Sequence, residues 1–307
     1  MHQTSQDMAA NRPILVFGGG GQLGRDLARC ASERGMPLAA RSRAEADIAD
    51  PDSVRRALHD LGPSLVVNAA AYTAVDAAED NAGDAERGNA IGPGVLAREC
   101  ETLGVPLVHI STDYVFDGTK PAPYDEDDPV APLGVYGRTK AAGEAAVREA
   151  GERHVILRTA WVYGEFGRNF LKTILRLAAE RDELRIVADQ RGCPTSTRDL
   201  AEAILRTAPR LAAGDPVWGT YHFAGDGETS WHGFAERVVA RLAQAGGRRP
   251  AVIPIATADY PTRARRPANS VLDCSRFERV FGFKGRPWAD EVDAVTDRLI
   301  AAGGETN

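Results

Sequence analysis

Apolar runs of strand length alternate with longer amphipathic segments through the first half of the chain. PILVF precedes GQLGRDLARCASERG, MPLAA precedes SVRRALHDLG, and the runs SLVVNAAA, VPLVHIST and HVILRTAWVYG follow. Strands that are apolar throughout need cover on both faces, and intervening helices provide it. The pattern therefore predicts an α/β fold with a Rossmann-like, doubly wound parallel sheet.

The alternation loosens after about Gly164, where the helix-like FLKTILRLAAERDE is followed by Gly- and Pro-rich connections. We therefore expect an NADPH-binding Rossmann domain over residues 13–164. A smaller, interleaved substrate-binding domain is expected over residues 165–307, with segments that return to the Rossmann domain. The polar opening, residues 1–12, precedes the first predicted strand and is expected to be a flexible tail.

Charge and hydropathy exclude some classes of partner. Lys and Arg total 37 against 43 Asp and Glu, which gives a net charge of -6, so the basic footprint of a nucleic-acid-binding protein is absent. No apolar run reaches the roughly 18 residues that span a bilayer, and the opening lacks the apolar core of a signal peptide. We expect a cytoplasmic protein that binds neither nucleic acid nor membrane.

The segment FGGGGQLGRDL joins the first predicted strand to the first predicted helix and carries glycines at three-residue intervals. Glycine permits a tight turn and a close approach to a diphosphate, and a helix N-terminus favours negative charge. Glycine also serves plain turns, but the strand-to-helix context favours a dinucleotide site. The predicted cofactor-binding residues are Gly18, Gly21, Gln22, Leu23 and Gly24.

The second predicted strand ends in arginine rather than in an acid. NAD-binding folds use an acid there to hold the ribose hydroxyls, whereas an arginine accommodates the 2′-phosphate of NADP. Because MPLAA leads into Arg41, Ser42 and Arg43, we predict NADPH, with NADH and a merely solvated arginine loop as alternatives. Asp47 and Ile48 are predicted to form a wall of the adenine site.

Tyr136 and Lys140 in YGRTK lie on one face of a predicted helix. A free phenol has a pKa of about 10, and an adjacent cation lowers it toward the range useful for proton transfer to a carbonyl oxygen. Ordinary surface helices also contain this spacing. Thr112, however, ends the run VPLVHIST, where open α/β sheets bind ligands, and Pro129 and Pro132 disfavour an earlier helix start. The three residues are predicted to form a catalytic group.

With these motifs the chain resembles the extended short-chain dehydrogenase/reductase family over nearly its whole length. NAAAYTAVDAAE and STDYVFDG resemble the family's branch of reductases that act on a dTDP-linked 4-keto sugar. The resemblance implies reduction of dTDP-4-dehydro-6-deoxy-L-mannose at C4 by NADPH to dTDP-L-rhamnose, for cell-surface polysaccharide. Tyr136 would donate the proton, Lys140 would lower the tyrosine pKa and hold the nicotinamide ribose, and Thr112 would polarise the carbonyl.

The resemblance also implies roles for residues around this group. Asp113 would contact the sugar nucleotide, and Trp161 would lie at the substrate pocket, although a large indole also suits a protein core. Small side chains at Ala69, Ala70 and Ala71 would let the backbone pass under the cofactor, although packing alone would also suit them.

The stretch TRARRP, residues 262–267, is the densest basic segment of this acidic chain. A guanidinium can pair with phosphate oxygens through two parallel hydrogen bonds, so Arg263 and Arg266 are predicted to bind the substrate diphosphate. A solvated loop is the alternative. The acidic run Asp125–Asp128 is expected to be a solvated loop and not a cation site.

Some members of the family bind magnesium through glutamates at a dimer interface. The matching positions here hold Asp26 and, less surely, Asp199, whose side chains are shorter. We therefore predict no required metal, and either a monomer or a homodimer.

Two other functions remain open. The same branch resembles the NADP-binding regulatory beta subunit of methionine adenosyltransferase, which is not catalytic, but the presence of Thr112, Tyr136 and Lys140 argues against that role. Nucleotide-sugar epimerases and dehydratases share the fold and the Tyr/Lys pair. Dehydratases carry an acidic pair directly after the position of Thr112, whereas this chain has Asp113 followed by Tyr114.

Overall fold

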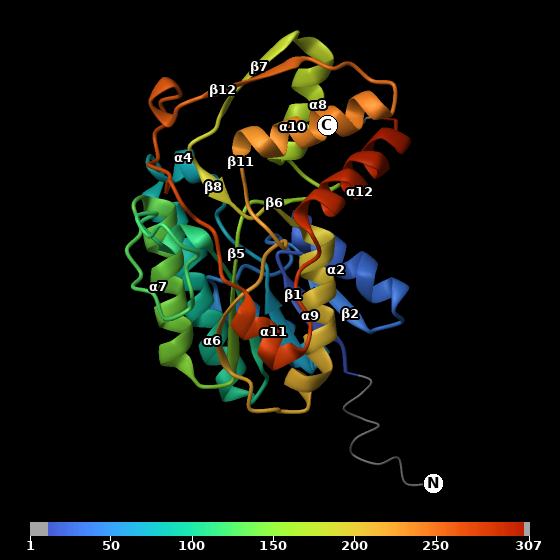
Figure 1. Cartoon of the computed structure of the whole chain (residues 1–307). Helices are drawn as coiled ribbons and strands as arrows, with labels where there is room; N and C mark the ends of the chain where they lie inside the picture. The colour runs from blue at the N-terminus through green and yellow to red at the C-terminus, as the bar shows by residue number, and fades with distance from the viewer. Residues whose placement is uncertain (1–11, 304–307) are drawn as a thin grey trace.

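A six-stranded parallel sheet forms the centre of the molecule, a computed structural model that describes residues 12–303 (Figure 1). In spatial order its strands are β2 (Leu38–Arg41), β1 (Ile14–Phe17), β3 (Leu65–Asn68), β4 (Leu107–Thr112), β5 (His154–Thr159) and β10 (Gly219–His222). The chain winds outward from β1 in both directions, so the predicted doubly wound Rossmann-like fold is confirmed.

Alternate residues of β1 enter the two cores on opposite faces of the sheet, as expected for a strand with a side-chain period of two. Ile14 and Val16 pack against one helical layer, and Leu15 and Phe17 against the other. The first layer contains α2 (Gln22–Glu33), α9 (Thr197–Ala212) and α11 (Ser275–Phe281), and the second contains α3 (Pro51–Leu61), α6 (Gly92–Thr102) and α7 (Val135–Ala150).

Local signals set the bounds of these helices. The Asp50 side chain caps α3 by accepting a hydrogen bond from the amide of Asp52, and Gly62 ends it with φ of +50°. Gly134 precedes α7, so Tyr136 falls in the first turn of that helix as predicted. The loop after β3 carries short helical pieces: α4 (Val75–Ala78), α5 (Ala82–Glu86) and a π-helical turn at Arg87–Ile91.

A second layer of helices covers the carboxyl ends of the sheet strands and appears at the top of Figure 1. Its helices α8, α10 and α12 share one apolar core. The layer comprises β6 (Val162–Tyr163), α8 (Phe170–Glu180), β7 (Glu183–Val187), β8 (Arg191–Gly192), β9 (Thr195–Ser196), β11 (Thr229–Ser230), α10 (Trp231–Gln244), β12 (Ala251–Ile255) and α12 (Trp288–Ala301). Strands pair as β7 with β12, β6 with β9 and β8 with β11. Short 3-10 turns lie at Asp113–Val115 and Thr257–Asp259.

The predicted division at Gly164 stays a prediction. The helices α9 and α11 and the strand β10 follow Gly164 in the sequence, yet they pack on or extend the central sheet. The expected tail, residues 1–12, lies outside the described residues except for Arg12, which donates hydrogen bonds to the carbonyl oxygens of Gly62 and Pro63. Between residues 12 and 303, no helix combines the length and apolarity needed to cross a membrane.

Candidate active site

The glycine turn is packed so closely that side chains are excluded from it. Gly18 has φ of +87°, and a Cβ there would lie 2.6 Å from the carbonyl carbon of Ala69. A Cβ on Gly24 would lie 2.4 Å from the carbonyl oxygen of Gly18. The amides of Gly18 and Gly19 donate to the carbonyl oxygen of Arg41. The turn therefore fixes the ends of β1, β2 and β3 against the start of α2.

A cavity of about 650 Å³, here called the main cavity, opens at the carboxyl ends of the strands. Its volume lies in the range usual for small-molecule sites, which is roughly 300–1,000 Å³. The structure brings most of the predicted site residues together in its lining. These are Gly21, Gln22, Leu23, Ala69, Ala70, Ala71, Thr112, Asp113, Tyr136, Lys140 and Trp161.

The chemistry of this lining fits a dinucleotide. In the described part of the chain, no side chain caps α2 at Gly21, and its first turn carries no acid. Its first amides and the positive end of the helix dipole can therefore receive a diphosphate. The three alanines at positions 69–71 let the β3 backbone form part of the opposite wall.

Five predicted cofactor residues lie outside the lining of the main cavity. Gly18 and Gly24 belong to the closely packed glycine turn but do not line the cavity themselves. Arg41 ends β2, and its guanidinium is 3.4 Å from the carbonyl oxygen of Ala40. Asp47 pairs with Arg87 at 2.9 Å and Ile48 is buried. Contact of Arg41, Asp47 and Ile48 with the cofactor stays a prediction.

Tyr136 presents its phenol to the main cavity from the first turn of α7. Its ring packs edge-to-face against Tyr114, with centroids 5.9 Å apart. Burial raises the pKa of Tyr136 to about 12, the Thr112 hydroxyl opposes this shift, and the charge of Asp113 adds to it. Desolvation of the phenolate thus outweighs the favourable interactions in this structure, and the predicted lowering of this pKa by Lys140 stays a prediction.

Lys140 is 2% exposed, and its Nζ donates to the carbonyl oxygen of Ile110 at 2.6 Å. Burial lowers the pKa of Lys140 to about 8, while Glu144, one turn further along α7, opposes the shift. The ammonium is thus held by a main-chain carbonyl of β4, and both Lys140 and Tyr136 line the main cavity.

Thr112 and Asp113 form a polar pair at the end of β4. The Thr112 hydroxyl donates to Asp113 Oδ1 at 2.9 Å and accepts from the amide of Tyr114 at 3.2 Å. Asp113 Oδ2 is buried and has no hydrogen-bond partner among residues 12–303. Burial raises the pKa of Asp113 to about 7, although the nearby hydroxyls of Ser270 and Thr112 oppose this. An unpartnered buried acceptor suits a ligand hydroxyl.

Trp161 belongs both to an apolar core and to the lining of the main cavity. It is 9% exposed, belongs to the apolar core beneath α8 and α10, and lines the main cavity, so both interpretations of the sequence describe it. Its φ of +47° is the only positive φ of a non-glycine residue in the described part of the chain. Its indole stacks on Trp231 and leaves no room for a Cβ at Gly192.

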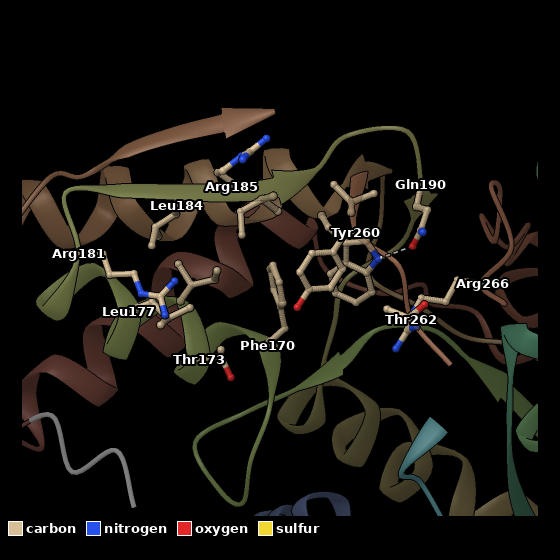
Figure 2. A pocket seen from close by; sticks show the side chains of 14 residues that line it. Phe170, Thr173, Leu177, Arg181, Leu184, Arg185, Gln190, Tyr260, Thr262 and Arg266 are labelled. Atoms are coloured by element: carbon tan, nitrogen blue, oxygen red, sulfur yellow. Dashed lines mark hydrogen bonds between the residues drawn. The ribbon is translucent and has the colours of Figure 1, made fainter. Parts of the chain in front are cut away.

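A second cavity of about 390 Å³, here called the side cavity, lies between α8, β7 and the segment that contains Tyr260 (Figure 2). Phe170 and Trp231 line both cavities, which are therefore adjacent. Sequence reasoning missed most of this lining, because it comes from segments far apart in the chain with no shared motif. The missed residues include Phe170, Arg181, Arg185, Gln190, Trp231, Tyr260 and Thr262.

The two predicted diphosphate ligands are placed differently. Arg266 lines the side cavity and makes a two-point pair with Asp76, at 2.7 Å and 3.1 Å. Arg263 pairs with Asp80 at the exposed surface, outside the lining of both cavities. Their binding to substrate stays a prediction.

The acidic positions considered for metal binding are engaged by other side chains. Asp26 accepts from Arg29 and Thr197, and Asp199 accepts from the amide of Arg286. Along the acidic run, Lys120 pairs with Asp125 and Asp128, while Arg276 pairs with Glu126 and Asp127.

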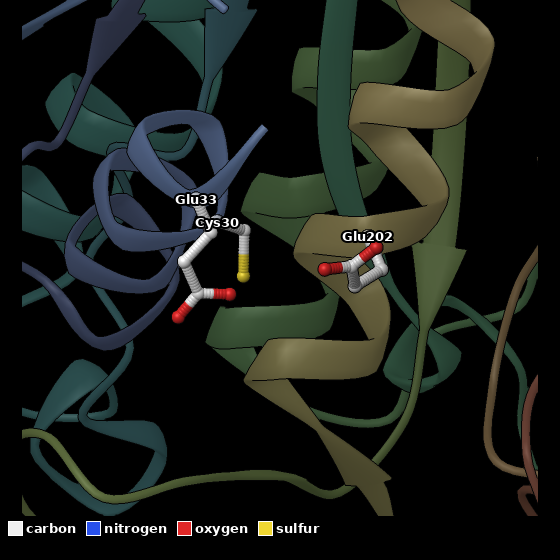
Figure 3. Close-up of side chains that lie close together, drawn as sticks. All are labelled: Cys30, Glu33 and Glu202. Carbon is white, nitrogen blue, oxygen red and sulfur yellow. The ribbon is translucent and has the colours of Figure 1, made fainter. Parts of the chain in front are cut away.

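Another group of potential ligands, Cys30, Glu33 and Glu202, lies between α2 and α9 (Figure 3). Glu33 pairs with Arg198 at 2.6 Å and Glu202 pairs with Arg34. Burial raises the pKa of Cys30, which favours the thiol over the thiolate that a metal needs. Salt bridges to Arg198 and Arg34 therefore explain why these acidic side chains lie here.

Comparison with known proteins agrees with this geometry. A family model described as the RmlD substrate binding domain matches residues 12–301. A dTDP-4-dehydrorhamnose reductase of Burkholderia thailandensis is 47% identical over 298 residues, which cover 94% of this chain and 99% of the relative.

Solved structures lead to the same family. A dTDP-4-dehydrorhamnose reductase of Clostridium acetobutylicum has a TM-score of 0.88 at 36% identity, covering 94% of this chain and 99% of the other. The enzyme of that name from Bacillus anthracis, in complex with NADP, has a TM-score of 0.86 at 34% identity with the same coverage. The resemblance found in the sequence is thus confirmed. The chain belongs to the RmlD substrate binding domain family.

Proposed function

We propose that the chain reduces the C4 ketone of dTDP-4-dehydro-6-deoxy-L-mannose (dTDP-4-dehydrorhamnose) with NADPH and so forms dTDP-L-rhamnose. One observation carries the proposal. Thr112, Tyr136 and Lys140 line the same cavity as a helix N-terminus suited to a dinucleotide. The chain that holds this arrangement is 47% identical, over nearly its full length, to a reductase of that name.

The cofactor would lie between the glycine turn and the alanines that follow β3. Amides at the start of α2 would hold its diphosphate, and the absence of an acid at the end of β2 suits the 2′-phosphate of NADPH. The Bacillus anthracis relative was solved with NADP. When bound, NADPH supplies the hydride that reaches C4 of the sugar.

The chain itself would supply the proton. At neutral pH a phenol with a raised pKa stays protonated, which is the form that donates, so Tyr136 can transfer its proton to the oxygen at C4. The Thr112 hydroxyl would hydrogen-bond the same oxygen. The Lys140 ammonium would stabilise the phenolate that remains, and a proton from solvent would then restore the phenol.

The nucleotide end of the substrate would extend toward the side cavity. Phe170 and Trp231 line both cavities, and a sugar near Trp161 would continue past them into a diphosphate and a base. Arg181, Arg185 and Arg266 line the side cavity and supply positive charge for an anionic ligand. The aromatic rings there offer flat apolar surfaces for a base.

The test uses purified protein, NADPH and dTDP-4-dehydrorhamnose prepared by the preceding epimerisation reaction. We expect absorbance of the reduced nicotinamide to fall and dTDP-L-rhamnose to form, as identified by mass spectrometry and proton NMR. A protein that binds NADPH yet leaves it unoxidised would contradict the proposal and favour the regulatory, non-catalytic role. Isomerised or dehydrated sugar without net loss of NADPH would instead favour an epimerase or dehydratase.

We further propose a cytoplasmic location and a monomeric or homodimeric state. Cell fractionation tests the first. Size-exclusion chromatography with light scattering tests the second, because a 32.9 kDa chain separates clearly from its dimer.

A further inference from the structure

A buried ion pair lies below the main cavity and joins α7 to two strands. Glu144 and Arg158 are each 1% exposed, and two hydrogen bonds connect them, from Nε at 2.8 Å and from Nη2 at 2.7 Å. Ser111 donates to the same carboxylate at 2.6 Å, and Arg148 donates at 2.7 Å from the surface side. The carboxylate of Glu144 is therefore fixed in position by β4, β5 and α7 at once.

This carboxylate lies one helical turn beyond Lys140. The recorded hydrogen bond of the Lys140 ammonium goes to the Ile110 carbonyl, a neutral acceptor that does not compensate for its lost hydration. Burial alone disfavours the charged form of the lysine, and Glu144 is the neighbouring charge that opposes this effect. Glu144, one turn along α7 from Lys140, is thus the acid whose charge favours the ammonium.

The other groups around the pair do not replace this charge. Burial lowers the pKa of His109 on β4, an effect to which Lys140 adds, and burial lowers the pKa of His222 on β10 to about 3, so both stay neutral. Arg158 on β5 and Arg148 on α7 are cations and lie on the carboxylate. Although burial opposes it, the hydrogen bonds and charge of Arg158 keep the pKa of Glu144 below its ordinary value.

We propose that Glu144 is a positioning residue for the reduction: its carboxylate, fixed by Arg158 and Ser111 one helical turn along α7 from Lys140, keeps the Lys140 ammonium charged. This role rests on the reductase function proposed above. A buried ion pair is in itself weak evidence for stability, because apolar residues of similar volume often replace it without loss. Because Glu144 lies one turn from Lys140, however, the ion pair can also act on the charge of that lysine.

The first test compares the pH dependence of kcat/KM for the full-length wild-type protein and Glu144→Gln. Loss of an adjacent opposite charge shifts a pKa by about one unit or more. The pKa of Lys140 should therefore fall from about 8 toward about 7 or below. We expect Glu144→Gln to lose about fivefold at pH 8 and to change little at pH 6. Glu144→Asp, which keeps the charge, should restore most of the alkaline activity.

Arg148→Gln is the matched control. Arg148 contacts the same carboxylate from the surface, and its own side chain is 43% exposed. Its replacement by glutamine leaves the Glu144 carboxylate charged. Because screening weakens such exposed pairs, we expect its pH profile to coincide with that of the wild type. A Glu144→Gln profile that is lower by one constant factor at every pH would overturn the proposal and leave Glu144 a packing residue.

A second readout needs neither cofactor nor turnover. The sequence has four lysines, Lys120, Lys140, Lys172 and Lys284, so NMR of protein labelled with carbon-13 at the lysine ε-carbon gives few signals. Lys140→Arg assigns the signal of interest. Its titration midpoint should move to lower pH in Glu144→Gln and stay in place in Arg148→Gln. An unmoved midpoint in Glu144→Gln would overturn the proposal.

Folding and the parent function are checked separately. If circular dichroism shows that Glu144→Gln is unfolded, Glu144→Gln/Arg158→Met, which leaves no buried guanidinium unpaired, takes its place with the same two expected outcomes. A wild-type protein that leaves NADPH unoxidised would contradict the reductase function, whereas the NMR titration would still decide whether Glu144 controls the charge of Lys140. Failure of one proposal is therefore distinguishable from failure of the other.

Discussion

The indole of Trp161 lies flat against that of Trp231, with ring centroids 3.6 Å apart and planes 6° apart. Trp161 lines the main cavity, whereas Trp231 lines both cavities. Trp231 also donates from its ring nitrogen to Gln190 at 3.2 Å, which fixes the orientation of the stack. A ligand that occupies both cavities must therefore pass this aromatic wall.

Replacement of Trp231 by alanine should weaken substrate binding and leave cofactor binding intact. Loss of an aromatic stacking surface costs about 0.5–1.5 kcal/mol beyond lost burial, so we expect KM for the nucleotide sugar to rise by about two- to tenfold. Steady-state kinetics and NADPH titration by fluorescence measure the two effects. Trp231→Phe, which keeps a ring, should fall between the wild type and Trp231→Ala. An unchanged KM in Trp231→Ala would show that substrate does not reach this wall.

Tyr136→Phe should remove the proton donor while keeping the ring that packs on Tyr114. General acid catalysis contributes about 10²–10⁴-fold, so we expect kcat to fall by at least about a hundredfold. The NADPH dissociation constant and the melting temperature should stay close to those of the wild type. A variant that fails to fold or to bind NADPH would instead show that the phenol is structural.

Gly24→Ala should destabilise the glycine turn, because the new Cβ would lie 2.4 Å from the Gly18 carbonyl oxygen. Overpacking of this kind costs about 1–3 kcal/mol, and we expect a lower melting temperature and weaker NADPH binding. Gly20→Ala is the matched control, since no described atom lies within 4 Å of a Cβ at that position. Equal melting temperatures for the two variants would contradict the close packing.

Asp113 should make folding stability depend on pH. Its carboxyl has a folded-state pKa raised to about 7 by burial, against about 3.9 when unfolded. Because the folded state binds the proton more tightly, the stabilising contribution is full below about pH 4 and is lost as pH rises to about 7. We expect Asp113→Asn to gain in melting temperature relative to the wild type from pH 5 to pH 8. A constant difference across this range would contradict the prediction.

The sheet and the catalytic group were predictable because their signals are local in the sequence. Apolar runs predict strands buried on both faces, and the glycine turn, Thr112 and the pair Tyr136 and Lys140 each belong to one short motif. Parallel strands bring such motifs to one edge, so sequence alone predicts that they meet. The lining of the main cavity confirms their proximity.

Two aspects of the site could not be predicted in this way. The side cavity is built from α8, β7 and residues near Tyr260, and only tertiary packing sets their distance. The pKa of Tyr136 depends on the balance between desolvation and neighbouring groups, and the sequence shows the cation at position 140 but not the burial. The Ile110 carbonyl that holds Lys140 is a main-chain atom, for which side-chain motifs carry no signal.

The edge strand β10, at the opposite side of the central sheet from β2, affects how the protein folds during translation. Its residues 219–222 are made some sixty residues after β5, against which they align. Until they leave the ribosome, β5 has an unpaired edge, and such edges invite association with other chains. We therefore expect the first 164 residues alone to aggregate, and the nascent chain to complete its central sheet only after the first part of the covering layer, from β6 to β9, has been synthesised.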